Sequence, residues 1–259
     1  MKHLTRASLA VAIAALPALA SAQAKPEPDY TLTANVTLAS QYLFRGISQT
    51  DGKPAIQGGF DFAHKSGVYL GNWNSNISWL SDANPGLTAP IEMDFYGGWK
   101  TTLGDFGLDF GGIYYYYPLR NDPPGFVSPD TFEAYAGASW GPLSVKFSYA
   151  FTDFFGLKDS DGSYYIDGTV NYPIADTGFS VLAHLGYQGV STNSTTPTCL
   201  NGSKSYSYTD WRLGGAYTID GWTIGAYWSD TSAESACWTN LAGRNLSKSQ
   251  FLATISRSF

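Results

Sequence analysis

The sequence predicts an all-β chain, a single twelve-stranded, antiparallel, up-and-down transmembrane β-barrel of the outer-membrane type. Three observations predict this fold. Apolar and polar residues alternate along short segments of the chain. Short and long connections alternate between these segments. The composition combines 18 Tyr, 15 Phe, 8 Trp and 28 Gly with only 14% charged residues, against about 25% in an ordinary soluble domain.

The first 24 residues have the features of a cleaved secretory signal peptide. Lys2 and Arg6 precede an apolar run, and two overlapping Ala-x-Ala patterns follow it. The apolar run is too short to span a bilayer. We therefore expect residues 25–259 to form the barrel domain. This part carries 13 Lys+Arg against 21 Asp+Glu, a formal charge of −8, so nucleic acid is not an expected partner.

The alternation is clearest in residues 143–151, which read LSVKFSYAF. Every second residue is large and apolar, and the residues between are Ser, Lys and Ala, so one face of the strand is apolar and the other polar. Similar segments bounded by turn residues predict twelve strands, at 31–48, 54–64, 67–79, 91–101, 106–118, 131–140, 143–155, 163–174, 179–190, 208–219, 222–231 and 247–259.

The connections between the predicted strands are of two kinds. Five are tight turns rich in Gly, Pro, Asp or Ser, which read HKSG, TLGD, GP, ADTG and DG. The six between them are usually longer. All long loops therefore lie at one end of the barrel and both termini at the other. Outer-membrane barrels have this arrangement, with periplasmic turns and termini and extracellular loops.

The last predicted strand, FLATISRSF, ends the chain on an aromatic residue. In a closed barrel the last strand pairs with the first, so the chain can end inside the structure. Phe259 would then lie at the periplasmic interface, where aromatic rings are common. The alternative is a soluble β-sandwich, but its water-facing side would display unusually few charges.

This strand also resembles the C-terminal strand of bacterial outer-membrane barrels, whose terminal Phe helps the assembly machinery to recognise them. Ile255, Ala253 and Phe251 fit the alternating apolar pattern of those strands, and Arg257 departs from it. The resemblance implies that Phe259 is an assembly signal and that the barrel-assembly machinery is a partner during biogenesis. Outer-membrane lipid and lipopolysaccharide would then surround the folded barrel.

The segment QYLFRGISQTDGKPAIQGGFDFAHKSGVYLGNWNSNISW is the most distinctive of the chain. It resembles the N-terminal signature of the TorF family, outer-membrane barrels assigned as porins and once catalogued as conserved bacterial proteins of unknown function. The resemblance rests on Tyr42, Arg45, Gly46, Ser48, Pro54, Gly58, Gly67, Tyr69, Gly71 and Trp73. It implies an outer-membrane barrel that passes small solutes, and it does not identify the solute.

Alternation along the strands points a set of polar side chains into the barrel. The predicted pore-lining residues are Arg45, Asp61, Asn72, Asn74, Glu92, Asp94, Lys100, Asp109, Glu133, Lys146, Asp167, His184, Asp210 and Arg212. Carboxylates outnumber cations in this set, which predicts a narrow, net-acidic lumen with a weak preference for cations. The alternative is that most of these charges pair across the lumen and hold the barrel together.

Arg45 has two possible roles. A continuous first strand would turn Tyr42 and Phe44 toward lipid and Arg45 into the lumen. Arg45 would then be either a cation in the outer part of the pore or the partner of an internal carboxylate such as Asp61.

The two cysteines, Cys199 and Cys237, lie in the fifth and sixth long loops. A disulfide between them is expected in an exported chain and would hold those loops over the mouth of the barrel; the alternative is two unpaired thiols. Neither cysteine has a His or Cys neighbour at zinc-ligand spacing. The DSDG stretch at 159–162 lacks the later ligands of a calcium loop. We expect no metal and no cofactor.

The expected function is that of a porin for small hydrophilic solutes or ions. An enzyme is not expected, because neither His64 nor His184 has an obvious serine partner and Gly-x-Ser-x-Gly is absent from the sequence. A structural or adhesive surface barrel without channel activity is the alternative. Long loops dense with charge or aromatic residues would favour it, whereas these loops are rich in Asn, Ser, Thr and Gly.

Overall fold

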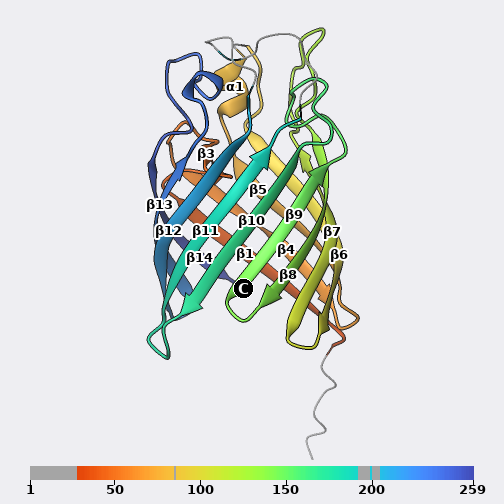
Figure 1. The fold of residues 1–259 in the computed structure, drawn as a ribbon, viewed down its shortest axis with the longest axis vertical. Helices are drawn as coiled ribbons and strands as arrows, with labels where there is room; N and C mark the ends of the chain where they lie inside the picture. The colour runs from red at the N-terminus through yellow and green to blue at the C-terminus, as the bar shows by residue number, and fades with distance from the viewer. Residues whose placement is uncertain (1–27, 85, 192–198, 200–204) are drawn as a thin grey trace, which may run out of the picture.

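Twelve strands close into one antiparallel ring (Figure 1), which confirms the predicted fold class. The computed structural model describes residues 28–84, 86–191, 199 and 205–259, so the predicted signal peptide lies outside the described residues. The ring consists of β1 (Tyr30–Ala39), β4 (Ala55–His64), β5 (Val68–Asn76), β6 (Ile91–Leu103), β7 (Phe106–Tyr116), β8 (Thr131–Trp140), β9 (Leu143–Ala150), β10 (Tyr164–Pro173), β11 (Phe179–Gly189), β12 (Tyr208–Ile219), β13 (Trp222–Thr231) and β14 (Gln250–Ser258).

Four short elements lie in the connections. Two strands, β2 (Leu43–Phe44) and β3 (Ile47–Ser48), pair only with each other. Helix α1 (Trp79–Ala83) and a 3-10 helix (Ser235–Cys237) are the others. No helix of the described residues is long and apolar enough to cross a membrane. In Figure 1 the long connections lie at the upper end of the barrel, and the tight turns and the C-terminus lie at the lower end. We call these the loop end and the turn end.

The ring closes between the first and last strands. β1 and β14 pair from Asn35↔Ser258 to Ala39↔Thr254. Beyond this register, the backbone amides of Ala34 and Phe259 each donate to the carbonyl of the other, at 3.1 and 2.8 Å. The chain therefore ends with its last residue hydrogen-bonded into the wall.

Most predicted strands match the observed bounds within a few residues, because the alternation that predicts them is a local property. Three predicted strands run too far toward the loop end. Residues 40–48 leave the wall, residues 77–79 lead into α1, and residues 151–155 belong to a loop.

Tyrosine rings lie along the inner wall over glycines of neighbouring strands. A Cβ added to Gly71 would lie only 2.2 Å from the Tyr96 ring, and one added to Gly186 would lie 2.1 Å from the Tyr165 hydroxyl. Close approach of an aromatic ring requires glycine at both positions. The abundance of Gly and Tyr in the sequence is thus partly explained by tyrosine rings that pack over glycines of neighbouring strands.

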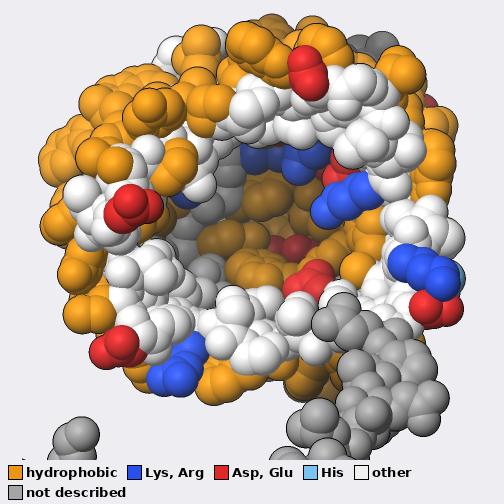
Figure 2. All heavy atoms as spheres, turned by 90° about the horizontal axis from the view of Figure 1, so that it is seen from below, with side chains coloured by type: hydrophobic (Ala, Val, Ile, Leu, Met, Phe, Trp, Pro, Cys, Tyr) orange, Lys and Arg blue, Asp and Glu red, His pale blue; other side chains and the backbone are white. Residues whose placement is uncertain are grey.

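The outer face of the barrel is apolar, and the turn end is hollow. Large apolar side chains point outward from every strand of the ring; the most exposed include Leu32, Phe60, Leu70, Leu103, Trp140, Leu185, Leu213 and Phe251. Figure 2 looks into the turn end and shows a deep hollow with acidic and basic side chains on its rim and wall, surrounded by hydrophobic side chains on the outside. A closed sheet with an apolar exterior is the form that a strand-built membrane protein takes.

Candidate functional site in the barrel lumen

The chain after β1 folds into the lumen as a hairpin, which we define as residues 42–49. Its two-residue turn is Arg45-Gly46, with φ of 47° and 80°. Positive φ at both central residues characterises the mirror-image turn that suits a two-residue hairpin. The prediction that Tyr42 and Phe44 face lipid is therefore wrong, because both side chains lie inside the barrel and join its buried cluster.

Arg45, at the tip of the hairpin, reaches the far side of the ring. Its Nη2 lies 2.6 Å from Glu133 on β8, and its Nη1 donates to Gln188 on β11 at 2.7 Å. The guanidinium also lies 4.4 Å from the centre of the Tyr165 ring on β10. These strands stand opposite β1 in the order of the ring. Arg45 therefore pairs with Glu133, and not with Asp61, and the hairpin crosses the lumen.

Polar and apolar contacts hold the body of the hairpin. The Tyr42 hydroxyl donates to Glu92 at 2.6 Å, and Tyr117 donates to the other oxygen of Glu92 at 2.8 Å. The Tyr42 ring also meets the edge of Trp73 at 5.3 Å between centroids. The buried cluster around it contains Ala39, Tyr42, Leu43, Ala55, Ile77, Leu80, Leu87, Ala89, Tyr115, Tyr117 and Leu252. Packed side chains thus occupy much of the loop-end half of the lumen.

Loops cover the hairpin from the loop end. Asp51, just after the hairpin, accepts from Asn240 at 3.0 Å and lies 3.5 Å from Arg244. The backbone amide of Trp79 donates to the Gln49 carbonyl. Cys199 and Cys237 form a disulfide, which joins the fifth and sixth long loops as expected from the sequence.

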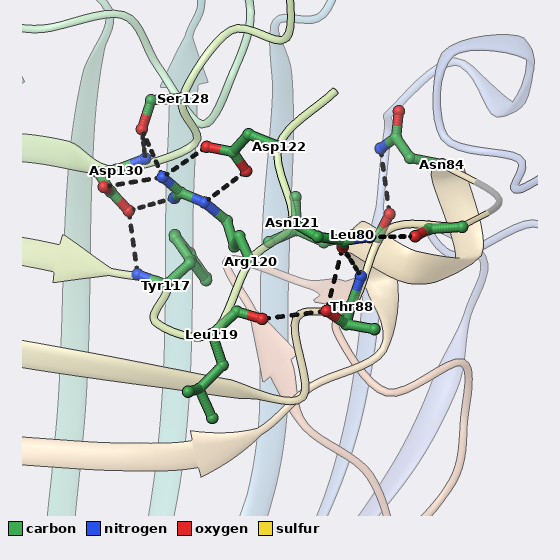
Figure 3. A network of polar contacts seen from close by, with 11 residues as sticks. Leu80, Asn84, Thr88, Tyr117, Leu119, Arg120, Asn121, Asp122, Ser128 and Asp130 are labelled. Atoms are coloured by element: carbon green, nitrogen blue, oxygen red, sulfur yellow. Dashed lines mark hydrogen bonds and ion pairs between the residues drawn. The ribbon is translucent and has the colours of Figure 1, made fainter. Parts of the chain in front are cut away.

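A second polar network stabilises the third long loop at the rim (Figure 3). Arg120 binds Asp130 at 2.6 Å and Asp122 at 3.0 Å, and it also donates to Ser128. Asn121 donates to the Gly86 carbonyl and so ties this loop to the one before it. Burial lowers the pKa of Arg120, but the Asp130 and Asp122 carboxylates outweigh it and raise this pKa. These contacts hold the loop in one arrangement.

The hairpin separates two cavities. The cavity toward the loop end has a volume of about 290 Å³ and is lined mainly by aromatic residues, among them Trp79, Phe155, Tyr208 and Trp238. The cavity toward the turn end has about 250 Å³ and is lined by Phe44, Tyr115, Thr169, Leu182, Arg45, Lys146, Tyr165, Asp167, His184, Asp210 and Arg212. We call the second one the turn-side cavity. Phe44 of the hairpin lines both cavities.

Tyrosine hydroxyls bind most of the carboxylates in the lumen. Asp61 accepts from Tyr96 at 2.6 Å, and Asp109 accepts from Tyr69 at 2.6 Å. Asp210 accepts from Tyr165 at 2.8 Å. The cross-lumen pairing of opposite charges that the sequence suggested as an alternative is realised by Arg45 and Glu133.

His184 belongs to a hydrogen-bonded network on β10, β11 and β12. Its Nε2 lies 3.0 Å from Asp210 and 3.0 Å from the Tyr165 hydroxyl, and its Nδ1 lies 3.0 Å from the Thr169 hydroxyl. Among the described residues no serine or cysteine contacts either ring nitrogen. In the same part of the chain, no group of three or more His, Cys, Asp or Glu side chains is placed to hold a metal ion.

The strand pairing gives the direction of the predicted pore-lining side chains. Twelve of the fourteen lie inside the barrel. Arg45 is on the hairpin, and the eleven that point inward from the strands are Asp61, Glu92, Asp94, Lys100, Asp109, Glu133, Lys146, Asp167, His184, Asp210 and Arg212. Asn72 and Asn74 point outward instead. Asn72 is the register partner of Phe60 and Phe95, which are 61% and 46% exposed on the outer face.

The outward placement of Asn72 and Asn74 has a physical reason. Trp73 between them packs inward against Tyr42 of the hairpin, so its neighbours on β5 must point the other way. The Asn72 amide donates to the Asp94 carbonyl, and the Asn74 amide donates to the Gly58 carbonyl and to Asn72. These bonds satisfy the amide donors on an otherwise apolar face.

Sequence reasoning missed the roles of Tyr42, Tyr117 and Gln188, which hold the hairpin in place. The available signal was the Arg-Gly dipeptide between Leu43-Phe44 and Ile47-Ser48. A dipeptide that ends in Gly between two short segments with apolar residues is a hairpin signal, but the alternation that continues across it suggests a single strand.

Comparisons with known proteins support the fold. A family model described as a bacterial protein of unknown function (Gcw_chp) matches residues 23–259, and it bears a different name from the TorF family expected from the N-terminal segment. A search of curated proteins finds no match. The KdgM porin is similar in structure, with a TM-score of 0.53, 9% identity, and coverage of 88% of this chain and 99% of that one.

Two further structures are similar. The KdgM porin in complex with disordered oligogalacturonate has a TM-score of 0.52 and 9% identity, with 88% of this chain and 99% of that one covered. The Acinetobacter baumannii outer membrane protein Omp33 has a TM-score of 0.46 and 8% identity, with 89% and 97% covered. At 9% identity the likeness to the two KdgM porin structures shows the fold alone.

Proposed function

We propose that this chain, which belongs to the Gcw_chp family of bacterial proteins of unknown function, is an outer-membrane channel for small hydrophilic solutes or ions. The hollow, polar turn end of the closed barrel is the observation that supports this most. A lumen lined by carboxylates and cations and open to one end holds water, and a water-filled lumen is the basis of passive diffusion. The shared architecture with KdgM porins, one of them in complex with oligogalacturonate, supports the same function.

The proposed topology has the loop end outside the cell and the turn end in the periplasm. Both described chain ends lie at the turn end, and cleavage of the predicted signal peptide would leave the barrel domain to begin there. The Phe259 ring is 69% exposed and stacks near the Arg257 guanidinium, at 5.5 Å from the ring centre. An aromatic ring beside an arginine suits the interface between lipid and water. Lipopolysaccharide and the barrel-assembly machinery remain the proposed partners.

The hairpin is the proposed constriction of this channel. Arg45 and Glu133 are 8% and 1% exposed in their side chains, so the pair lies in a closely packed part of the lumen. A solute that crosses the barrel must pass around the hairpin or displace it. We therefore expect low conductance from the wild-type protein, with a weak cation preference because carboxylates remain the majority of the inward charges.

The test is single-channel conductance in planar bilayers, with the reversal potential measured in a salt gradient. We expect small stepwise currents from the wild type and larger ones from Arg45→Ala, because the hairpin tip loses its anchors to Glu133 and Gln188. Arg45→Lys is the matched control, since it keeps a cation beside Glu133. Folding of each variant is checked by its mobility on unheated gels. Folded variants that never conduct would contradict the proposal.

A structural or adhesive surface barrel is the second candidate. The filling of the loop-end half by the hairpin and its buried cluster favours it, because a barrel without transport needs no open passage. The same bilayer experiment separates the two candidates. A folded Arg45→Ala variant that stays silent supports the structural function, and stepwise current supports the channel.

A further inference from the structure

Three charged side chains in the turn-side cavity have no hydrogen-bond or ion-pair partner among the described residues, although the Lys146 amine lies 5.6 Å from the centre of the Tyr135 ring. Lys146 on β9 and Arg212 on β12 form no ion pair within 4.0 Å, and the Nε atom of Arg212 is buried without an acceptor. Asp167 on β10 forms no hydrogen bond or ion pair within the same part of the chain. All three line the cavity.

The other charges at this level of the lumen are occupied. Asp210 is bound by Tyr165 and lies beside His184. Arg45 at the top of the cavity is bound by Glu133 and Gln188. Charged groups without a hydrogen bond or ion pair gain most from a ligand of complementary charge, because they have no such bond to give up. Lys146, Asp167 and Arg212 are therefore the groups of the cavity that are free to bind a solute.

Their order around the wall defines a pattern of charge. Lys146 is the register partner of Asp167, and Arg212 lies two strands beyond it, opposite His184. Two cations thus flank one carboxylate. A bare anion would be attracted by the cations and repelled by Asp167. A solute with a carboxylate and several hydroxyl or ammonium donors satisfies all three groups, since Asp167 can accept from its donors.

We propose that the turn-side cavity binds small organic acids rich in hydrogen-bond donors, of which sugar acids are the representative class. Lys146 and Arg212 bind the carboxylate of the solute, and Asp167 accepts from its hydroxyl groups. A volume of about 250 Å³ is below the usual range for drug-sized ligands and suits a solute of monosaccharide size. The proposal rests on the proposed function and names the solute class that this one site binds. The weak cation preference expected for simple ions follows instead from the majority of carboxylates in the whole lumen.

Isothermal titration calorimetry on the full-length protein folded in detergent micelles tests the site directly. The probes are D-glucuronate and D-glucose, which differ only in the carboxylate. We expect saturable binding of glucuronate and at least about tenfold weaker binding of glucose. Lys146→Gln and Arg212→Gln should each weaken glucuronate binding about tenfold, which corresponds to one charge-assisted hydrogen bond. The matched control is Lys100→Gln on β6, whose amine lies 3.9 Å from Asp109 and which should leave binding unchanged.

Inorganic phosphate is the probe for a bare anion. It should bind more weakly than glucuronate to the wild type, and Asp167→Asn should reduce or reverse this preference. Equal binding of glucuronate and glucose, or full binding by Lys146→Gln and Arg212→Gln, overturns the proposal. So does tight phosphate binding that Asp167→Asn does not change.

Micelle binding requires no current, so the two failures are distinguishable. Binding without conductance would contradict the proposed channel function and support the binding site. Conductance without selective binding would support the channel function and contradict the binding site.

Discussion

Glu133 near the loop end of the barrel is fully buried, whereas β9 is exposed on both faces from Leu143 to Phe147 near the turn end. The same β9 continues to Ser148 and Ala150, which are buried again. The change from exposed to buried side chains occurs within one strand, so a difference between strands does not explain it. The hairpin causes it by filling one half of the ring. The comparison teaches that a short inward insertion, and not the wall, decides how much of this lumen is open.

Among variants that test this difference between the two halves, we expect the largest loss of stability from Glu133→Ala. It leaves the Arg45 guanidinium buried without its counter-charge, which should lower the free energy of unfolding by about 3–5 kcal/mol. Urea unfolding in lipid vesicles, followed by tryptophan fluorescence, measures it. The matched variant in the hollow half is Lys146→Ala, which should change stability by less than about 0.5 kcal/mol. Equal losses in both variants would contradict a division between a packed and a hollow half.

The disulfide should contribute the next largest effect. It links positions 38 residues apart, and the Cys199→Ser/Cys237→Ser double variant should lose about 2–4 kcal/mol. We also expect faster proteolysis within the fifth and sixth long loops. Reduction of the wild type with dithiothreitol should give the same result. Unchanged loop proteolysis would indicate that the loops are held by their other contacts alone.

A smaller effect is expected from Tyr42→Phe, which removes one of the two hydroxyl donors to Glu92. An unsatisfied buried acceptor should lower stability by about 1–3 kcal/mol and raise the conductance as the hairpin loosens. Tyr114→Phe is the control, because the Tyr114 ring lies on the outer face and is 40% exposed. A Tyr42→Phe variant as stable and as poorly conducting as the control would show that packing alone holds the hairpin.

The smallest effect on stability and the clearest effect on selectivity are expected in the hollow half. Lys146→Glu should move the reversal potential further toward cations, since it replaces a free cation of the lumen by a carboxylate. Its unfolding free energy should fall by no more than about 1 kcal/mol, because the new carboxylate stands opposite Asp167 in the strand register. A selectivity that responds to Arg45→Lys but not to Lys146→Glu would place the selective region at the hairpin instead.

The wall of the barrel is predictable from the sequence because its information is local. Alternation and turn residues predict twelve strands, and the even strand count and the terminal Phe259 predict closure. The hairpin is not predictable in the same way. Tyr42 and Phe44 continue the alternation of β1, and only their contacts with Glu92 and Trp73 and with the buried cluster distinguish them from lipid-facing residues.

The partners inside the lumen escaped prediction for a related reason. Arg45 lies 88 residues from Glu133 in the sequence, and a charge pattern does not identify a partner at such a distance. The sequence leaves open whether the inward carboxylates pair with cations, and nothing in it indicates that tyrosine hydroxyls bind Asp61 and Asp109. Asn72 and Asn74 were assigned to the lumen by their polarity, and the packing of Trp73 reverses that assignment.

The position of the hairpin directly after β1 has a consequence for the order of assembly. β1 pairs with β14, which is made last, while the tip of the hairpin binds residues of β8 and β11. The tip of the hairpin can therefore take its final place only when β8 and β11 stand in the wall opposite β1. Formation of the Arg45–Glu133 pair thus reports that the middle strands of the chain have assembled around the hairpin.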